Sequence, residues 1–435
     1  MPKAPRRAAG HPPRHQPLEQ SILLTATLCL LAAGAVMVYS ASSARTLLAA
    51  HGSGAGTGYL VKYVGYGALG LVVMRVLSLR GSAILRKGMP ALLAGSLLLV
   101  LAVKGVGVEV NGARRWLGVG PVQFQPSEVL KLALVLYACH ALSARPESVR
   151  SLRGLRPLLV ITALSCAAVA LQPDLGTALL IGFTMIALLV AAGLPLRLLG
   201  VLMAVALVAV LAFALASPYR THRLTSFLDP WAHAGSSGFQ AVQGQIAIGS
   251  GGLLGVGPGR SVQKIFYLPE AHTDFILAVI GEELGVLGVT VLLFLYGLIA
   301  YAGLLAARRA RDLYSRLLAT GLTSMILCQA TLNVFAVLGL APLTGVPLPF
   351  VSYGSSNLVI LLAAMGLLLN IAGGPKRLRA VASRDGAVGK AAGDAGRPEP
   401  RRWGGGPERD EDRDRRRRDR GTRRAGAGGR AGTAG

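Results

Sequence analysis

The sequence predicts an all-α, polytopic integral membrane protein with about ten transmembrane helices. Apolar runs of about 20 residues recur along the chain, and each is long enough to cross a bilayer as a helix. The chain is 52% hydrophobic and has a mean hydropathy of +0.53, values that exclude an ordinary soluble domain. Basic residues concentrate in alternate connections between the runs, which is the pattern of cytoplasmic loops.

The spans follow from apolar windows of that length. The fifth and sixth are joined only by a tight external turn, QPDLG at 172–176. All four cysteines lie inside apolar runs and show neither metal spacing nor a disulfide framework, so we interpret them as small core residues. The predicted spans cover residues 21–41, 58–78, 88–108, 126–144, 156–172, 175–193, 196–217, 272–304, 314–340 and 352–372.

The positions of lysine and arginine orient these spans. Basic clusters precede the first span and fall between spans two and three, four and five, six and seven, and eight and nine. With ten spans, all of these clusters and both termini lie on one side, which the positive-inside rule assigns to the cytoplasm. The extracytoplasmic side then holds Gly105–Gln125 and a large loop between spans seven and eight, Ser217–Ala271. Long loops in a compact body are usually functional, so the function is expected outside.

Two polar ends flank the membrane domain, which we assign to residues 21–375. The N-terminal tail, 1–20, is basic, and no small-residue cleavage site precedes the first apolar run, which favours a retained helix over a removed signal peptide. The tail at 376–435 holds 18 Lys and Arg against 9 Asp and Glu and is expected to be disordered. Arginine runs can bind nucleic acid, but here we expect a solvated cytoplasmic tail against anionic lipid headgroups and no nucleic-acid partner.

Two external segments carry cations in spite of the positive-inside rule. Arg114 and Arg115 lie in NGARRWLGVG, and Lys264 lies in the large loop together with three arginines. Cations that stay on the translocated side indicate an anionic partner there. The alternative is that they pair with external carboxylates or with lipid phosphates.

The segment KIFYLPEAHTDFILAVIGEELG, 264–285, holds the strongest candidate for chemistry. It places His272 and Asp274 at the mouth of an apolar helix, and Glu282 and Glu283 about 12–13 Å further along it. Carboxylates at a membrane edge are costly and mark functional sites, so we interpret Asp274 as catalytic. The alternatives are a helix N-cap or a partner for a loop arginine. We expect Glu282 and Glu283 to be hydrogen-bonded within the bundle, and a lone histidine is more often structural than catalytic.

Two further motifs lie near the outer side. Glu128 and Lys131, three residues apart in PSEVLK, share one helix face and can pair near the external end of span four. They either contact a substrate or form an ion pair that only makes their burial tolerable. The glycine-rich run IGSGGLLGVGPG at 248–259 lacks the ending of a phosphate loop, so we expect it to let an external loop lie close to a substrate or to neighbouring helices.

Four segments resemble, in order, the SEDS family of bacteria, the shape, elongation, division and sporulation proteins. The resemblance covers about residues 20–375, and the wording YLPEAHTDF is closer to the division members than to the elongation members. One position departs, because Ser355 stands in SYGSSN where the family usually has SYGGSS, and it must accept the backbone geometry that glycine supplied. The four segments are NGARRWLGVGPVQFQPSEVLKLALVLY, QPDLGTALL, GFQAVQGQIAIGSGGLLGVGPGRSVQKIFYLPEAHTDFILAVIGEELG and LAPLTGVPLPFVSYGSSNLVILLAAMGLLLNI.

The resemblance implies a ten-helix fold and a peptidoglycan glycosyltransferase. Such an enzyme polymerises lipid II on the outer face of the cytoplasmic membrane, here for septal wall synthesis, and releases undecaprenyl diphosphate. The resemblance also implies that the aspartate of the HTDF motif, Asp274, is essential. The implied partners are a class B penicillin-binding protein transpeptidase and other division proteins.

This reaction needs a base for the attacking hydroxyl, cations for the departing diphosphate and a groove for polyprenyl tails. A diphosphate leaves without a general acid, so one carboxylate suffices where ordinary glycosidases use two. Residue spacing supports no metal site, although Mg²⁺ or Mn²⁺ bridging the diphosphates is chemically reasonable. The candidate substrate contacts are Arg114, Arg115, Glu128, Lys131, Lys264 and His272.

Three alternatives stay open at this point. A lipid II flippase would need ionisable groups distributed through the bundle, whereas here the candidates cluster at the outer edge. A scaffold for division proteins would tolerate replacement of Asp274. An elongation-type member would share the chemical motifs and differ in cellular role.

Overall fold

The computed structural model describes residues 17–49, 57–81, 83–110, 113–119, 122–215, 221, 225–266, 268 and 271–374. The predicted C-terminal tail at 376–435 lies outside the described residues, as do Arg220 and Arg223 of the large loop. All the described elements belong to one unit of the chain, residues 1–382.

The helices confirm the all-α, multi-pass class. Nine of the described helices are long and apolar enough to cross a membrane, and α6 (Leu175–Ala191) is a shorter apolar helix of 17 residues at the lower limit for a span. Each predicted span corresponds to one helix. The other nine are α1 (Leu18–Ala49), α2 (Gly58–Arg80), α3 (Ala83–Val106), α4 (Pro126–Ala144), α5 (Leu152–Ala170), α7 (Leu196–Leu215), α11 (Ile276–Arg309), α12 (Leu313–Val337) and α13 (Ser355–Ala372).

Local sequence fixes where several helices begin. Ser151, Asp174 and Asp312 cap α5, α6 and α12, because each side chain accepts a hydrogen bond from the main-chain NH three residues later. Pro126 occupies the first turn of α4, where its missing NH costs nothing. The tight turn predicted between spans five and six therefore carries its own helix cap at Asp174.

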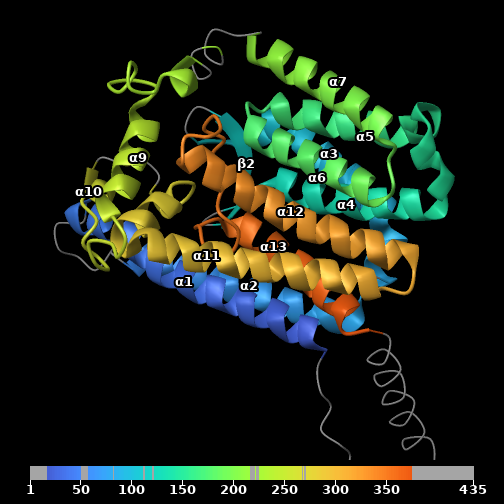
Figure 1. The fold of residues 1–435 in the computed structure, drawn as a ribbon, viewed down its shortest axis with the longest axis horizontal. Coiled ribbons are helices and arrows are strands. Elements are labelled where there is room, and N and C mark those ends of the chain that lie inside the picture. The colour runs from blue at the N-terminus through green and yellow to red at the C-terminus, as the bar shows by residue number, and fades with distance from the viewer. Residues whose placement is uncertain are drawn as a thin grey trace, which may run out of the picture. The chain divides into compact units, whose positions relative to one another are not determined.

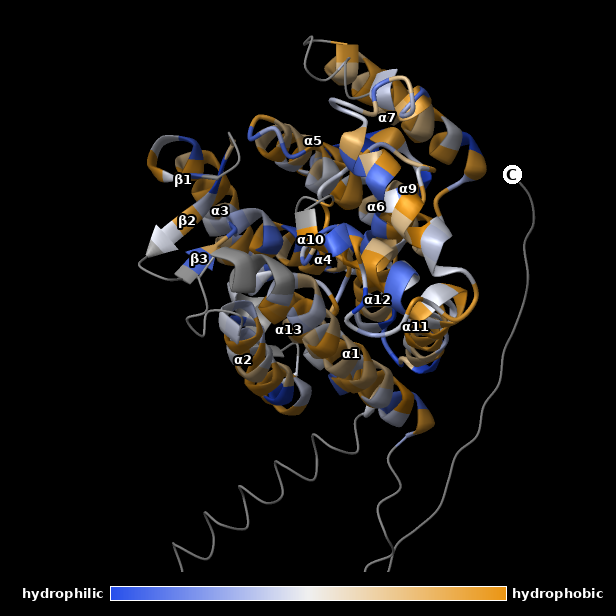
Figure 2. Ribbon diagram, turned by 90° about the vertical axis from the view of Figure 1, so that its left-hand side faces the viewer, coloured by the Kyte–Doolittle hydropathy of each residue, from blue (hydrophilic) through white to orange (hydrophobic). Residues whose placement is uncertain are grey.

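The helices pack around α12 and α13, whose apolar windows are 72% buried. α13 lies against α2, α1 against α11, and α12 against α4, α6 and α11 (Figure 1). Apolar colour runs along these helices (Figure 2). By contrast only 6% of the apolar window of α7 is buried, so this helix presents apolar side chains outward as a lipid-facing span does.

The first outer segment forms a small sheet that the sequence analysis missed. Strands β1 (Val108–Val110), β2 (Ala113–Val119) and β3 (Val122–Phe124) pair antiparallel in the order β1-β2-β3. Val108 pairs with Trp116, with a bulge between Val108 and Glu109, and Leu117 pairs with Phe124. Strands this short carry little alternation of polar and apolar residues, which is why the pattern of the sequence did not reveal them.

The long helix α11 is broken at Gly285, which corrects the prediction of one continuous span over 272–304. Gly285 has φ +65° and ψ −164°, values that no helix contains. Glu282 and Glu283 therefore do not lie deeper along the spanning helix. They end the outer piece, 276–284, at its junction with the piece that crosses the membrane.

The glycine-rich run fills this break. The NH groups of Val256 and Gly257 donate to the carbonyl oxygens of Glu282 and Glu283, at 2.9 and 3.1 Å, and the NH of Val286 donates to the oxygen of Gly252. The run comes from the large outer loop, between α9 (Phe239–Gly251) and the short α10 (Gln263–Phe266). The expectation that its glycines bring a loop close to neighbouring helices is confirmed.

Candidate active site

Asp274 lies between the large loop and α11, with its side chain partly exposed. The hydroxyl of Thr273 donates to Asp274 Oδ1 at 3.1 Å. The N-cap of α11 is Phe275, where no side-chain cap bond is made. The carboxylate is therefore not used at the capping position, which removes the support for the N-cap alternative.

The turn 340–354 packs against two segments that are far from it in the sequence, the HTDF segment at Asp274 and the QPDLG turn. Gly345 of the turn 340–354 has φ +67°, and a Cβ placed on it would lie 3.9 Å from Asp274 Oδ2. In the same way a Cβ on Gly176, in the QPDLG turn, would collide with the carbonyl oxygen of Thr344. The turn 340–354 thus lies close to the carboxylate of Asp274 and, on another side, in tight contact with the main chain of the QPDLG turn, where only glycine fits at position 176.

The turn 340–354 is held rigidly by contacts with α1, α2 and α11. Phe350 is non-glycine at φ +63°, a strained conformation that persists only where surroundings enforce it. Tyr296 donates its hydroxyl hydrogen to the oxygen of Pro349 at 2.6 Å, and Tyr63 donates to the oxygen of Phe350. Gly34 on α1 leaves room for Tyr63 and the turn. A turn held in this way can present its groups to a ligand in a constant geometry.

His272 is buried, 6% exposed, and packs among aromatic rings. Its ring centroid lies 4.5 Å from that of Tyr59 and 5.7 Å from that of Tyr353, and the NH of Tyr353 donates to its main-chain oxygen at 3.0 Å. Burial, reinforced by the neighbouring phenols of Tyr66 and Tyr59, raises the pKa of Tyr353 to about 12, so this hydroxyl stays protonated. The histidine is embedded in structure, and its contact with substrate stays a prediction.

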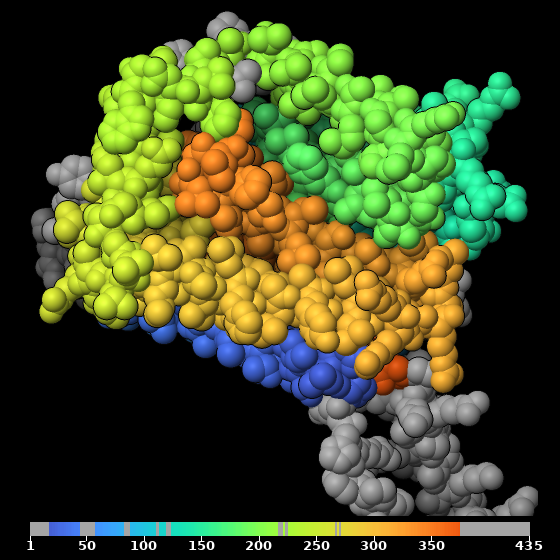
Figure 3. Space-filling model, in the orientation of Figure 1, coloured from blue at the N-terminus to red at the C-terminus, as the bar shows by residue number. Residues whose placement is uncertain are grey.

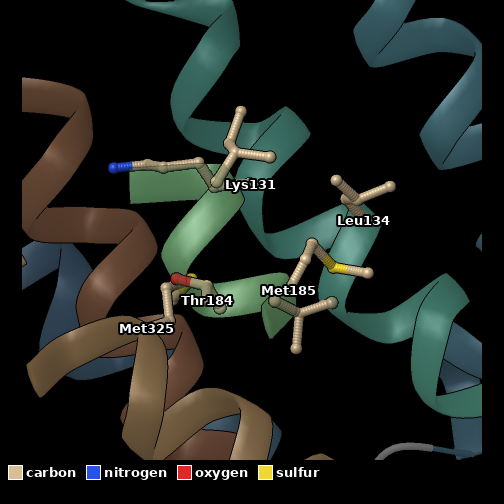
Figure 4. Close-up of a pocket in the computed structure, with 7 residues that line it drawn as sticks. Lys131, Leu134, Thr184, Met185 and Met325 are labelled. Atoms are coloured by element: carbon tan, nitrogen blue, oxygen red, sulfur yellow. The ribbon is translucent and has the colours of Figure 1, made fainter. Parts of the chain in front are cut away.

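Glu128 and Lys131 form the predicted pair. Lys131 Nζ lies 2.9 Å from Glu128 Oε2, both side chains are at least 96% buried, and Nζ also donates to Gln329 Oε1 at 3.3 Å. The stem of Lys131 lines a cavity of about 10 Å³ with Met185 and Met325, but its ammonium group points away from them (Figure 4). That cavity is nearly apolar and no larger than a water molecule, so the pair belongs to the interior of the bundle.

Lys264 and the two glutamates at the break form a second buried cluster. Lys264 Nζ lies 2.7 Å from Glu283 Oε1 and 2.9 Å from Ser40 Oγ on α1. Glu283 Oε2 accepts from the NH of Gly259, and Glu282 accepts from the NH of Val262 and from the hydroxyl of Ser261. Both glutamates are hydrogen-bonded within the bundle as predicted, because they hold the loop 259–264 against α1 and α11.

The two arginines of β2 differ in their surroundings. Arg114 is 52% exposed and pairs loosely with Glu109 at 3.4 Å. Arg115 donates from Nε to the main-chain oxygen of Gln172 at 2.9 Å and also donates to that of Pro173. The sheet is thus attached to the QPDLG turn, and Arg114 is the cation with more room to contact a ligand.

Ser355, where the chain departs from the family pattern, is accommodated. It is the first residue of α13 and does not have a positive φ. Its hydroxyl donates to the oxygen of Gln123 at 2.8 Å, and Ser356 Oγ accepts from the NH of Gln125 at 3.1 Å. The two serines therefore join the turn to β3 and the start of α4.

A larger cavity of about 370 Å³ adjoins the turn. In the space-filling view, the end of α12 and the following turn lie between α9 and α7 on the visible face (Figure 3). Among the described residues, the walls of this cavity carry hydroxyl and amide groups and no charged side chain, and α9 also contacts Phe275 through Gly244. The lining residues are Ser226, Phe227, Pro230, Ser236, Ser237, Gln240, Ala241, Gln245, Ala336, Gly339, Ala341 and Leu343.

Within the described residues, no group of three or more His, Cys, Asp or Glu could hold a metal ion. Sequence reasoning also missed four residues near the site: Tyr59, Tyr353, Gln329 and Asn333. A polar amide inside an otherwise apolar span was the signal available for the last two.

The nine long apolar helices, together with the shorter α6, thus define a multi-pass membrane protein in which Asp274 is a partly exposed carboxylate beside rigid, glycine-packed turns. The family model of cell cycle proteins that unites FtsW, RodA and SpoVE matches residues 20–376, and the chain belongs to this family.

Sequence relatives agree. The chain is 38% identical over 351 residues to stage V sporulation protein E of Bacillus subtilis, covering 80% of this chain and 96% of the relative. It is 41% identical over 357 residues to the probable peptidoglycan glycosyltransferase FtsW of Coxiella burnetii, covering 80% and 95%.

Solved structures agree as well. A chain from a peptidoglycan synthase complex, in a study of how polymerization and crosslinking are coordinated, is 33% identical with a TM-score of 0.68 and covers 80% of this chain and 96% of its own. The rod shape determining protein RodA of Thermus thermophilus is 31% identical with a TM-score of 0.59, covering 80% and 95%.

Proposed function

We propose that the chain is a peptidoglycan glycosyltransferase that polymerises lipid II into glycan strands at the outer face of the cytoplasmic membrane. The observation that carries the proposal is the position of Asp274, a partly exposed carboxylate beside the turn 340–354, which also packs against the QPDLG turn. A relative that is 41% identical bears the name of this activity.

In the proposed reaction, Asp274 is the general base. Its carboxylate takes the proton of the attacking sugar hydroxyl while that oxygen forms a bond to the anomeric carbon of the donor. The bond between the anomeric carbon and the diphosphate oxygen breaks, and the electron pair leaves with undecaprenyl diphosphate. The departing group is stable as an anion, so no second carboxylate is needed as an acid.

Cations on the outer side are proposed to hold the diphosphates. We assign the first contact to Arg114, because it is half exposed, and the second to Arg115, which borders the QPDLG turn. Lys131 and Lys264 are paired with Glu128 and Glu283, so they can reach a phosphate only by exchanging those partners. A Mg²⁺ or Mn²⁺ ion, if used, would arrive bound to the diphosphates, since the described residues form no carboxylate cluster to hold it.

The neutral parts of the substrate are assigned to other surfaces. The described residues that line the cavity beside the turn 340–354 offer hydroxyl and amide groups, which suit the hydroxyl groups of a saccharide. The apolar side chains of α7 suit the polyprenyl tail. His272 is proposed to border the sugar next to Asp274.

A flippase is the second candidate and is less well supported. Among the described residues, nearly all buried charged side chains lie at the outer end: Glu128, Lys131, Asp174, Lys264, Glu282 and Glu283, with Glu19 as the exception. A path for a polar headgroup through the bilayer would need such groups along its whole depth. Charge gathered at one end favours chemistry there.

The proposed partner is a class B penicillin-binding protein transpeptidase, together with other division proteins. Support comes from the structural match to a chain of a peptidoglycan synthase complex. The YLPEAHTDF wording and the FtsW names of the relatives favour the division septum as the location, whereas the sporulation and rod-shape relatives keep the other roles open.

Polymerisation by the purified chain tests this function. The chain is purified with its transpeptidase partner, given fluorescent lipid II, and compared with Asp274→Asn. We expect glycan polymer from the wild type and a loss of at least about 100-fold in the variant, because the amide cannot take the proton. Asp312→Asn is the matched control, since asparagine caps the start of α12 equally well.

Each result decides between the candidates. Equal polymer from wild type and Asp274→Asn would remove Asp274 as the base. If neither makes polymer, transfer of fluorescent lipid II across vesicle membranes by the wild type would establish the flippase instead. Absence of both activities would leave the scaffold.

A further inference from the structure

An asparagine on α12 contacts both segments that face each other at Asp274. Asn333 is 1% exposed, and its Nδ2 donates to the main-chain oxygen of Asp274 at 2.7 Å and to that of Val346 at 2.8 Å. The amide NH₂ offers two hydrogens in one plane, so it can serve both acceptors at once without a charge. The other amide atom, Oδ1, is buried with no hydrogen-bond partner in the part of the chain that the structure describes.

The two bonded carbonyl groups belong to the two segments that face each other at Asp274. One belongs to Asp274 itself. The other belongs to Val346, which follows Gly345, the residue whose added Cβ would lie 3.9 Å from Asp274 Oδ2. The length of one amide group therefore sets how far the HTDF segment stands from the turn.

A second amide on the same face of α12 also holds the turn 340–354. Gln329, one helical turn before Asn333, donates to the oxygen of Pro347 at 2.9 Å and to Asn357 Oδ1 at 3.2 Å. It accepts from Lys131 Nζ at 3.3 Å. Gln329 and Asn333 of α12 therefore hold two successive carbonyl groups of the turn, those of Pro347 and Val346. The turn cannot shift without breaking both hydrogen bonds, so Asn333 positions Asp274 relative to a turn that is itself fixed.

We propose that Asn333 is a positioning residue for the transfer reaction: its amide holds the main chain of Asp274 at a set distance from the Gly345 turn, so that the carboxylate meets the attacking hydroxyl in reactive geometry. The proposal rests on the proposed function of Asp274. Asn333 touches neither substrate nor the carboxylate oxygens, and it acts through the backbone. Displacement of a catalytic group by about 1 Å can cost about 100-fold in rate, so a small side chain suffices for a large effect.

Steady-state kinetics of the full chain with its transpeptidase partner and fluorescent lipid II test the proposal. Asn333→Leu keeps the approximate shape and removes both donors, and we expect kcat to fall about 10- to 100-fold with KM within about twofold. The matched control is Asn370→Leu, which removes an amide-to-carbonyl bond between α13 and Ser78 of α2, away from Asp274. We expect its kcat to stay within about twofold of the wild type.

The pH dependence of Asn333→Asp separates positioning from packing. An ionised carboxylate facing two carbonyl oxygens is unfavourable, so the pKa of the new aspartate rises, and the protonated form donates one of the two lost hydrogen bonds. We therefore expect the ratio of variant to wild-type kcat to rise severalfold from pH 8 to pH 5.5, even as the wild type itself slows. The elements packed against α12 carry titratable groups that are unchanged in both proteins: Glu128 and Lys131 of α4, Glu282 and Glu283 of α11, and His272 and Asp274 just before α11.

Three outcomes would overturn the proposal. The first is a folded Asn333→Leu protein with wild-type kcat, and the second is a kcat ratio for Asn333→Asp that does not change with pH. The third is loss of folding in both variants, at pH 5.5 as well, with Asn370→Leu intact, which would make Asn333 a residue of the bundle alone. Asp274→Asn is measured in the same series, so activity in that variant identifies a failure of the proposed function rather than of the positioning role.

Discussion

At the scale of single residues, buried charged side chains hold the large loop in place. Lys264 is joined to Glu283 and to Ser40, and Glu283 also holds Gly259. A buried ion pair often gives little net stability, yet removal of one member leaves a charge without compensation. We therefore expect the pair to hold the large loop against α1 and α11 only while both of its members are present.

This expectation is measurable as stability. Lys264→Met should lower the free energy of unfolding by about 3–5 kcal/mol, because Glu283 stays buried with its charge uncompensated. The double variant Lys264→Met with Glu283→Gln should recover part of that loss. Glu109→Gln, which breaks the exposed pair with Arg114, should cost less than about 1 kcal/mol. Unfolding of the detergent-solubilised protein is the measurement, and equal losses in the single and double variants would show that no coupling exists.

Which site residues the sequence predicts depends on how local their signal is. Asp274 could be selected from the sequence, because a carboxylate at a membrane edge is rare and stands in a distinctive motif, and its catalytic role stays a prediction. The Glu128–Lys131 pair follows from helical spacing alone. By contrast, the partner of Lys264 lies 19 residues away on another element, and Asn333 gains its meaning only from two carbonyl groups brought together by the fold.

At the scale of elements, the break in α11 is the main feature that hydropathy could not predict. The segment is apolar throughout, so a window average sees one long span, whereas the conformation at Gly285 depends on contacts with the glycine-rich run. That run supplies hydrogen-bond partners for main-chain groups on both sides of the break, so the irregular backbone there does not leave them unpaired. The small sheet was missed for the complementary reason, since its strands are too short to show a period.

Glycine at the break can be tested against a glycine elsewhere on the same helix. At Gly285 an alanine would need φ +65°, and its Cβ would lie 2.5 Å from the NH nitrogen of Gly255. Gly285→Ala should therefore cost at least about 1–3 kcal/mol and loosen the outer loop. Gly297→Ala, with nothing within 4 Å of its Cβ, should be neutral or slightly stabilising. Thermal unfolding and limited proteolysis of the loop would report both, and equal behaviour of the two variants would contradict a special role for Gly285.

At the scale of the whole molecule, the number of spans and their order follow from the sequence with little error. Apolar length and basic flanks act locally, so each helix carries its own signal. Which helix packs against which does not follow in the same way, because α12 and α13 become central through contacts that a single span does not encode. The side of the membrane on which each loop lies is still a prediction of the charge pattern.

Accessibility to a membrane-impermeant maleimide tests that orientation. In a variant without native cysteines, a cysteine at exposed Ala232 in the large loop should be labelled in intact spheroplasts. A cysteine at exposed Arg311, between α11 and α12, should react only after lysis. The reverse pattern would place the HTDF segment in the cytosol, where a lipid-linked sugar polymer is not built.

The break at Gly285 also bears on whether the chain crosses the membrane an even number of times. Beyond it, residues 286–309 make up 24 of the 34 residues of α11, roughly 36 Å of helix, which exceeds the hydrocarbon thickness of about 30 Å. The nine residues before it therefore need not enter the bilayer as a separate crossing, and the count of crossings stays even. An even count returns the chain to the side on which it began, and the basic connections then predict that both ends are cytoplasmic and that Asp274 lies on the opposite side.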